Sequence, residues 1–402
     1  MLDFRACDAD NHYYEATDAF TRHIEPSMVR RCMQWAELNG RQRLLVAGQI
    51  NDFIPNPTFD PVAKPGSLQA FFKGTEQSAK DVKSLFGELE PIRAEYRQRD
   101  ARLAVMDEQG LDAAWLFPTL GVGMEQSLLH DPAAIIAAFR AFNRWLDDDW
   151  GFAYRGRLFA APYLSLVDLD AAVSELEWAL DRGARIICVR TAPVTRGPSD
   201  PRLSGKIAHP TVSPFLEEFD AFWARVAEAG IVTAFHGGDT GYAHHVAAWE
   251  PAARGRAFFA SPLQRVIAKN RAITETMAAA ICHKVLDRHP RLRFAVVENG
   301  SAWLRDLLKK LDIAATQSAG WFRERPSDTF RRHVWVTPFW EDDPSEAAQV
   351  IGVERTLFGS DWPHAEGMAE PVSYADAIAA LGDDAVRRIM RDNFRELTSP
   401  LR

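Results

Sequence analysis

Short apolar runs alternate with segments of helical periodicity from about residue 100 to the end of the chain. The apolar runs predict buried strands at residues 113–118, 158–164, 185–190, 231–236, 292–298, 334–336 and 356–361. Each run is followed by a stretch in which apolar residues recur every three or four positions, which is typical of a helix packed on one face. The chain from residue 100 therefore predicts a regular succession of strands and helices.

Residues that begin and end helices support this succession. Asp131 and Pro132 predict a helix start, as N-cap and first helical residue. Ser213 and Pro214 predict a second start of the same kind, for a helix that Gly230 ends. Further helices are expected at residues 170–180, 274–286, 303–314, 346–351 and 374–397.

A first strand at residues 4–12 brings the number of expected strand–helix units to about eight. Alternation of this kind predicts an α/β fold with a parallel sheet. Eight units favour a closed (β/α)8 TIM barrel over an open doubly wound sheet, and no G-x-G-x-x-G motif follows a strand. Although 402 residues would also accommodate two or three domains, we expect residues 1–402 to form one barrel domain.

Two connections are too long to be plain loops. Residues 13–100 follow the first strand and include a proline-rich tract at 51–57, and residues 237–270 follow the fifth strand. We expect both to be insertions within the barrel domain. Lids or binding loops over the site and contacts between subunits are equally weighted roles for them, and both roles are compatible.

Composition narrows the partners and the location. The chain is 47% hydrophobic and 25% charged, with a net charge of −8 and no long basic run, so nucleic acid and anionic membranes are not expected partners. No apolar stretch reaches about 18 residues, and the N-terminus has no basic segment followed by an apolar run. We expect a cytoplasmic protein. The cysteines are far apart and form no C-x-x-C pair, so they are expected to be small buried hydrophobes: Cys7, Cys32, Cys188 and Cys282.

Candidate chemistry begins in the segment from Asp8 to His12. Asp8, Asp10 and His12 fall at every second position, so on a strand all three side chains would leave the same face. Such groups are costly in a core unless a metal ion or catalysis uses them. A polar turn explains this segment equally well when it is taken alone.

Polar side chains also end several of the later strands: Arg190, His236, Glu298 and Asp361. In a (β/α)8 barrel the catalytic groups lie at the carboxyl ends of the strands, so we expect these residues to converge with Asp10 and His12. Imidazoles and carboxylates without sulfur are the ligand types of zinc, manganese or iron. The strand ends therefore predict a divalent metal site.

With these residues in place, the chain resembles the amidohydrolase superfamily. It is most similar to the amidohydrolase-related family that includes aminocarboxymuconate-semialdehyde decarboxylase and resorcylate-type decarboxylases. The motifs that carry the resemblance are DADNH at residues 8–12, VTAFHGG at 232–238, RFAVVENG at 293–300, LFGSDWPH at 357–364 and IMRDNF at 389–394. The resemblance implies a metal-dependent (β/α)8 barrel whose ligands match Asp10, His12, His236 and Asp361.

This chain departs from the family pattern at three positions. Asp10 stands where the family usually has the first histidine of His-x-His, and Glu298 stands where a proton-shuttling histidine is usual. Arg190 ends strand four, where members with two metals carry a modified lysine. We therefore expect one metal in an unusually acidic site, with zinc the first choice and manganese or iron as alternatives. Glu298 either ligates the metal or moves protons.

The function that these residues and the resemblance imply is metal-dependent hydrolysis of a small, cyclic or aromatic substrate, with decarboxylation a close second, and the ligands do not decide between the two reactions. Glu298 and Asp361 are the expected catalytic residues, and Arg190, Trp340 and His364 are the expected substrate-binding residues. A structural ion pair for Arg190, core packing for Trp340 and a surface turn for His364 are the competing interpretations. We expect a homodimer. A barrel that has lost catalysis and only binds a ligand or partner is the alternative function.

Overall fold

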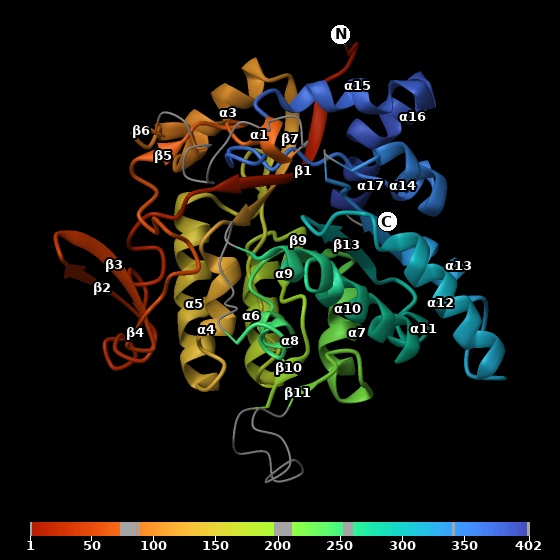
Figure 1. Cartoon of the computed structure of the whole chain (residues 1–402), viewed down its shortest axis with the longest axis horizontal. Helices are drawn as coiled ribbons and strands as arrows, with labels where there is room; N and C mark the ends of the chain where they lie inside the picture. Colours follow the sequence, from red (N-terminus) through yellow and green to blue (C-terminus); the bar gives the residue numbers. More distant parts are fainter. Residues whose placement is uncertain are drawn as a thin grey trace.

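Two parallel sheets form the centre of the computed structural model, which describes residues 2–72, 86, 89–196, 211–251, 260–339 and 342–399 (Figure 1). One sheet has the order β1-β7-β8, and the other has the order β14-β13-β12-β9. All pairs within them are parallel, which confirms the predicted α/β class. The strands are β1 (Ala6–Tyr13), β7 (Leu111–Pro118), β8 (Leu158–Ala160), β9 (Ile186–Val189), β12 (Val232–His236), β13 (Arg293–Val297) and β14 (Val334–Val336).

Backbone contacts link the two sheets at both edges. At one edge Tyr163, just beyond β8, forms a parallel bridge with Cys188 on β9. At the other edge residues 356–362 run between the sheets, with a parallel bridge from Thr356 to Val336 on β14 and another from Trp362 to Asn11 on β1. These links bring the carboxyl ends of strands from both sheets into one region.

Two strands predicted from apolar runs are shorter in the structure or are not strands. Residues 356–361 form no strand: isolated bridges occur only at Thr356 and at Trp362, and Asp361 between them has a left-handed φ of 56°. β8 ends at Ala160, short of the predicted residue 164. Pro162 has no backbone N–H to donate to a neighbouring strand.

Helices follow the strands and cover the sheets (Figure 1). The principal ones are α3 (Arg99–Glu108), α5 (Pro132–Asp149), α6 (Leu169–Asp181), α7 (Asp220–Ala229), α10 (Arg271–Cys282), α12 (Leu304–Gln317) and α14 (Pro344–Ile351). The predicted start of α5 is confirmed, since the Asp131 side chain accepts a hydrogen bond from the Ala134 N–H. The predicted start at Ser213 is wrong. Its hydroxyl accepts from the Phe215 N–H in a local turn, and α7 begins only at Asp220.

The C-terminal region is helical, as predicted, but it is broken into short helices. α15 (Tyr374–Ile378), α16 (Asp383–Arg387), the π-helix η7 (Arg388–Asp392) and α17 (Asn393–Thr398) follow one another. Gly382, with a φ of 89°, separates α15 from α16. The Trp115 indole on β7 donates to the Thr398 hydroxyl at 3.0 Å, which holds α17 against the core.

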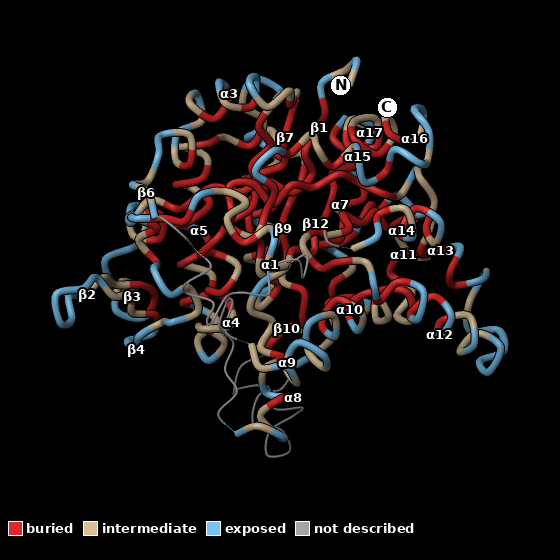
Figure 2. Tube along the Cα trace, turned by 45° about the horizontal axis from the view of Figure 1, so that its top comes forward, coloured by how far each residue is buried: buried red, intermediate tan, exposed pale blue. Residues whose placement is uncertain are grey.

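Buried residues are concentrated in the strands and in the inward faces of the helices (Figure 2). All eight residues of β1 are buried. Cys7, Cys32 and Cys188 are buried free thiols, as expected, and Cys282 is half-buried. In the described part of the chain, we find no helix with the length and apolar character needed to cross a membrane.

The two long connections contain secondary structure of their own. Between β1 and β7, the strands β2 (Met33–Leu38), β3 (Arg41–Val46) and β4 (Gln49–Ile50) form an antiparallel sheet that projects from the body of the molecule (Figure 1). The pair β5 (Val62–Ala63) and β6 (Leu89–Glu90) lies closer to the centre. After β12, the helices α8 (Ala243–Ala247) and α9 (Pro262–Ile267) precede α10.

Candidate metal centre

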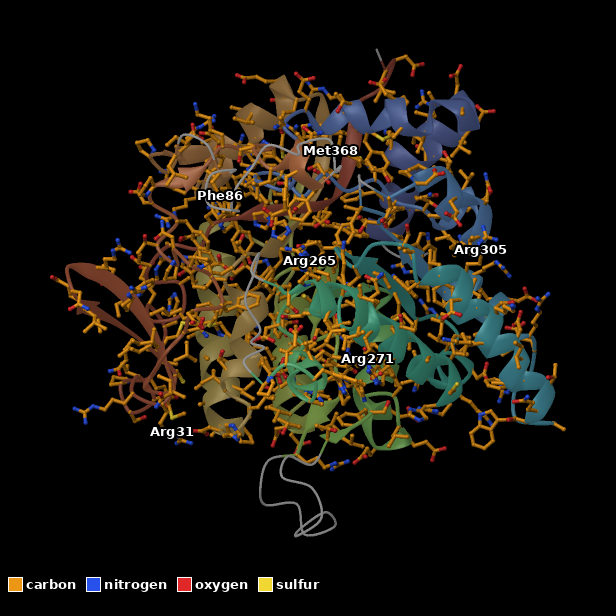
Figure 3. All side chains as sticks on the ribbon, viewed as in Figure 1. Arg31, Phe86, Arg265, Arg271, Arg305 and Met368 are labelled. Atoms are coloured by element: carbon orange, nitrogen blue, oxygen red, sulfur yellow. The ribbon has the colours of Figure 1, made fainter. Side chains whose placement is uncertain are left out.

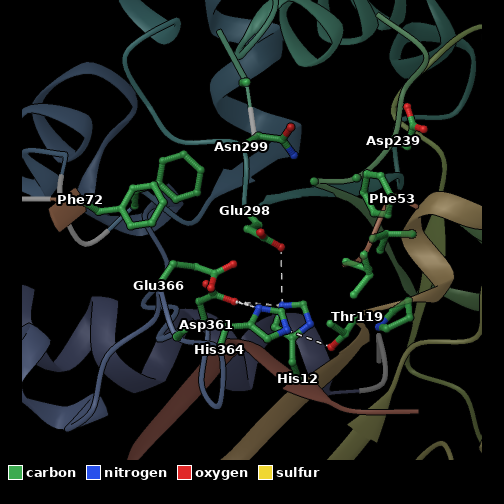
Figure 4. Close-up of a pocket in the computed structure, with 18 of the residues that line it drawn as sticks. His12, Phe53, Phe72, Thr119, Asp239, Glu298, Asn299, Asp361, His364 and Glu366 are labelled. Atoms are coloured by element: carbon green, nitrogen blue, oxygen red, sulfur yellow. Dashed lines mark hydrogen bonds and ion pairs between the residues drawn. The ribbon is translucent and has the colours of Figure 1, made fainter. Parts of the chain in front are cut away.

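Five of the side chains predicted from strand ends converge on one buried point. The His12 Nε2 atom lies 3.4 Å from Asp10 Oδ1, 3.6 Å from Glu298 Oε2 and 3.3 Å from Asp361 Oδ1. The His236 Nε2 atom lies 3.5 Å from Asp10 Oδ1 and 3.2 Å from Glu298 Oε2. Figure 4 shows the side chains of His12, Glu298 and Asp361 pointing toward one another. The structure thus brings together residues that are up to 351 positions apart, from Asp10 to Asp361.

The donor atoms at this point fit a divalent cation. Asp10 Oδ1, His12 Nε2 and His236 Nε2 are buried and form no hydrogen bond with any described residue. Donors from Asp10, His12, His236 and Glu298 all lie within 4.8 Å of one another. Buried acceptors without partners are costly, and a bound cation would satisfy them together.

The tautomer of His236 suits a metal ligand. Its Nδ1 atom lies 2.8 Å from the carbonyl oxygen of Gly237, so Nδ1 carries the proton and donates it. The lone pair on Nε2 then faces Asp10 and Glu298. Metal-ligating histidines usually donate their other ring N–H to a carbonyl or carboxylate in this way.

Electrostatics at the centre favour the metal-binding forms of Asp10 and His12. Burial acts to raise the pKa of Asp10, but the contacts with His12 and His236 outweigh it and lower the pKa to about 2. Burial, with His364 adding positive charge, lowers the pKa of His12 well below its ordinary value. Burial and the neighbouring Asp361 raise the pKa of Glu298 well above its ordinary value. Asp10 is therefore anionic and His12 neutral, and a cation would relieve the repulsion between Glu298 and Asp361.

The backbone at the centre is specialised. Glu298 and Asp361 have φ values of 51° and 56°, a left-handed conformation that is uncommon for non-glycine residues. Glycines nearby make room for the donors. A Cβ at Gly237 would lie 2.4 Å from the Glu298 carbonyl oxygen, and a Cβ at Gly359 would lie 2.5 Å from the Asp10 Cβ.

Asp8 does not join the metal donors, so the expectation that Asp8, Asp10 and His12 share one face is wrong. The pairing of β1 with β7 shifts register between Asp8 and Asn11, which breaks the strict alternation of side chains. The buried Asp8 carboxylate instead accepts hydrogen bonds from the Ser360 N–H at 3.0 Å, the Ser360 hydroxyl at 2.5 Å and the Asn11 amide at 2.9 Å. Asp8 thereby ties β1 to the segment that carries Asp361.

His364 lies beside the centre rather than in a surface turn. Its Nδ1 atom is 2.6 Å from Asp361 Oδ1, and its Nε2 atom is 2.9 Å from the Thr119 hydroxyl. Its ring packs on that of His12, with centroids 4.0 Å apart. Glu366, which sequence reasoning missed, has a carboxylate near those of Glu298 and Asp361. The close spacing of Asp361, His364 and Glu366 along the chain was the available signal.

Two predicted residues remain, Arg190 and Trp340, and the structure describes only Arg190. The Arg190 guanidinium donates to the side-chain oxygen of Gln126 and to the Thr240 carbonyl at 2.9 Å, and the structure does not bring it to the metal donors. This placement favours a structural role for Arg190. Trp340 lies outside the described residues. Glu15 anchors the turn after β7, because its carboxylate accepts from the Leu120 and Gly121 N–H groups.

A cavity of about 770 Å³ opens over the candidate metal centre. Asp10, His12, Glu298 and Asp361 line it, and Figure 4 shows Phe53 and Phe72 around it. Both long connections contribute to its wall: the first provides a series of aromatic residues, and the second provides α9. A large, mostly apolar cavity with a few convergent polar groups is typical of a small-molecule site.

The fold and the site together define a mixed α/β protein with a candidate metal centre where the carboxyl ends of its parallel strands meet. The sequence profile of the amidohydrolase family matches residues 53–397. The chain therefore belongs to the amidohydrolase family, which confirms the resemblance seen in its sequence motifs.

One solved structure of higher identity agrees with this assignment, and two of lower identity share the fold. An amidohydrolase from Mycobacterium avium subsp. paratuberculosis K-10 is 42% identical, with a TM-score of 0.91 over 100% of this chain and 99% of that chain. A dihydroxybenzoic acid decarboxylase from Polaromonas sp. JS666, with bound manganese and the inhibitor 2-nitroresorcinol, is 17% identical, with a TM-score of 0.58 over 83% and 93%. The 5-carboxyvanillate decarboxylase of Sphingomonas paucimobilis is 15% identical, with a TM-score of 0.57 over 99% and 100%. Comparison with curated protein sequences found no match.

Proposed function

We propose that this protein is a metal-dependent decarboxylase of an aromatic carboxylic acid that carries a hydroxyl group beside the carboxylate. The observation that carries the proposal is the convergence of Asp10, His12, His236, Glu298 and Asp361 under a largely apolar cavity. Decarboxylases of dihydroxybenzoic acid and of 5-carboxyvanillate share the fold. They favour carbon–carbon bond cleavage over the hydrolysis that the sequence motifs placed first.

The proposal includes a closed scaffold. The bridges at Tyr163, Thr356 and Trp362 support a single (β/α)8 barrel made from the two sheets. Residues 356–362 take the place of its eighth strand. On this basis residues 1–402 form one domain, and residues 13–100 and 237–270 are its insertions. The carboxyl ends of the strands would then form the floor of the cavity.

Asp10, His12, His236 and Asp361 are the residues that would hold the metal. The first three have donor atoms within 4.8 Å of one another and of a Glu298 oxygen, and Asp361 adjoins them at 3.3 Å from His12. When bound, a divalent cation supplies positive charge that attracts the substrate carboxylate and its neighbouring hydroxyl oxygen. Three carboxylates and two imidazoles make an oxygen-rich donor set. Such a set favours manganese over the zinc that was the first expectation, and iron is also compatible with it.

Glu298 is placed to move the proton. Its side chain is 25% exposed, compared with 6% for Asp10 and 12% for Asp361, so among these three carboxylates it faces the cavity most openly. In the reaction, the bond between the ring carbon and the carboxylate breaks and CO₂ leaves. The electron pair stays on the ring carbon, which takes a proton from Glu298. Solvent then returns a proton to Glu298.

The surroundings hold these groups in place and limit the access of water. The Thr119 hydroxyl forms a hydrogen bond with His364, and His364 in turn contacts the Asp361 carboxylate. These contacts restrict the orientation of that carboxylate. Phe53 and Phe59 line the cavity with apolar surface. Such walls favour a ring and strengthen the electrostatic interactions beneath it.

The test combines metal analysis with a substrate screen. We expect purified protein loaded with manganese to retain about one equivalent and to release CO₂ from hydroxybenzoic acids without hydrolysing esters, amides or lactones. Hydrolysis without any decarboxylation would overturn the lyase assignment. A wild-type protein that retains neither manganese nor zinc would overturn the metal centre itself.

Variants assign the roles. Glu298→Gln is expected to keep a metal and to lose activity by about 100-fold or more, since general acid catalysis contributes at least that much. His236→Ala is expected to lose the metal. Glu370→Gln, at an exposed position outside the cavity lining, is the matched control and should behave as wild type. Full activity in Glu298→Gln would contradict its role in proton transfer.

A further inference from the structure

The cavity is larger than one hydroxybenzoate ring requires. Its volume of about 770 Å³ lies in the upper part of the range of roughly 300–1,000 Å³ that is typical of pockets for drug-sized ligands. Apolar residues from the first long connection line it beyond the metal donors, among them Phe53, Phe59, Phe72 and Leu89. A substrate that fills this space has an apolar body extending away from the centre.

Two cations line the same cavity. Arg265 on α9 and Lys269, four residues later, both come from the connection that follows β12. Figure 3 labels Arg265. Both residues are exposed, so the folded protein pays no desolvation cost for their charges. They contrast with the acidic donors, which are buried at the strand ends.

Lys269 contacts an aromatic ring of the cavity wall. Its Nζ atom lies 4.8 Å from the centroid of the Phe339 ring. That ring packs against Gly300, where an added Cβ would come within 2.8 Å of it. Gly300 is two residues beyond Glu298, so Phe339 packs beside the backbone that carries this carboxylate and Lys269 contacts the same ring.

We propose that Arg265 and Lys269 bind a second anionic group, at the opposite end of the substrate from the carboxylate that is lost. This inference rests on the proposed function and specifies its substrate class: a hydroxyaryl acid with an apolar extension that ends in a carboxylate or another anion. The acidic centre with its metal takes one end, the aromatic wall takes the body, and the two cations take the other end. Each exposed ion pair contributes modestly, so together they give an advantage of about tenfold in affinity.

The experiment uses pairs of ligands that differ in one charge. The probes are salicylates with a carboxyalkyl chain of increasing length at the 5-position, each paired with the uncharged 5-alkyl salicylate of matching length. Calorimetry on the manganese-loaded protein measures the ratio of affinities within each pair. We expect the carboxylate to improve affinity about tenfold at one or more chain lengths, and we expect the double variant Arg265→Met, Lys269→Met to remove that advantage.

Two further variants serve as controls. Lys309→Met removes an exposed lysine on α12 that is not among the residues lining the cavity, and it should keep the advantage. Arg265→Lys preserves the charge and should keep most of it. The inference would be overturned if the wild type bound the carboxylate probe no more tightly than its uncharged partner at every chain length. It would also be overturned if the double variant kept the tighter binding of the carboxylate probe. An equal loss for both members of each pair would overturn it as well, since the two cations would then bind the reacting carboxylate.

Failure of the proposed function looks different. If the wild type retains no metal and decarboxylates no salicylate, the function itself is wrong. If it retains metal and decarboxylates the uncharged 5-alkyl salicylates while showing no carboxylate advantage, only the second anionic group is wrong.

Discussion

Replacing Glu15 by glutamine tests how a buried carboxyl near the centre couples stability to pH. Glu15 is 1% exposed, and its carboxylate accepts the Leu120 N–H at 2.9 and 3.0 Å and the Gly121 N–H at 2.9 Å. Burial raises its pKa to about 7 despite these bonds, from an ordinary value of 4.5. The folded protein therefore holds a proton on Glu15 at a pH where the unfolded chain has released it.

The sign and size follow from linkage between proton binding and folding. For a group whose pKa is raised in the folded state, the stabilisation is complete below the unfolded pKa of 4.5 and is lost as the pH rises through about 7. Between about pH 5.5 and about pH 8 the loss amounts to about 2 kcal/mol. Glutamine does not titrate and keeps an oxygen that accepts from the Leu120 and Gly121 N–H groups. Relative to wild type, Glu15→Gln should gain about 2 kcal/mol over this interval.

Urea unfolding at both pH values, on wild type and variant, measures the effect. The difference in free energy of unfolding between the two proteins should change by about 2 kcal/mol in favour of the variant as the pH rises. Glu108→Gln, at an exposed position on α3, is the control and should follow wild type at both pH values. An unchanged difference for Glu15→Gln would refute the argument that burial holds a proton on Glu15.

Three other perturbations have defined outcomes. Arg102→Met should lower the free energy of unfolding by about 3 kcal/mol, because the buried guanidinium donates to the Asn11 amide oxygen at 2.5 Å and stacks on Trp362. Urea denaturation measures this change, and a loss below about 1 kcal/mol would contradict the prediction. Gly359→Ala should weaken manganese binding at least about tenfold, because its Cβ would displace Asp10, and an unchanged affinity in a metal titration would argue against Asp10 as a ligand. Removal of the metal by a chelator should lower the Tm in calorimetry, and manganese at 100-fold excess over its Kd should restore about 2.7 kcal/mol; a Tm indifferent to both treatments would count against the metal centre.

The residues that converge at the centre were predictable because parallel strands share an edge. His236 and Glu298 each follow an apolar run, and the carboxyl ends of β12 and β13 are neighbours in the sheet. Periodicity and burial are local properties, so the order of residues reveals them. The family assignment came from the same short motifs, and the match over residues 53–397 confirmed it.

The backbone decided which polar residues face the centre. Strict alternation along β1 would have put Asp8 beside Asp10, but the register shift turns Asp8 toward Ser360 instead. Asp361 ends an apolar run that looked like a strand, yet its φ is left-handed, and this segment pairs with its neighbours only through isolated bridges at Thr356 and Trp362. Neither deviation has a signal in hydrophobic patterning, since the register of β1 is set by its pairing with β7 and the Asp8–Ser360 contact joins residues 352 positions apart.

Sequence by itself determined the α/β class, the positions of most strands and the kinds of side chain available to hold a metal. Only the tertiary structure decided that His364 lies against Asp361 and Thr119 rather than at the surface, and that Arg190 is occupied by Gln126 and Thr240. The physical reason is the distance along the chain over which each property is set. Periodicity is set by each residue's near neighbours along the chain, whereas the partner of a polar side chain at a strand end is set by distant segments that folding brings together.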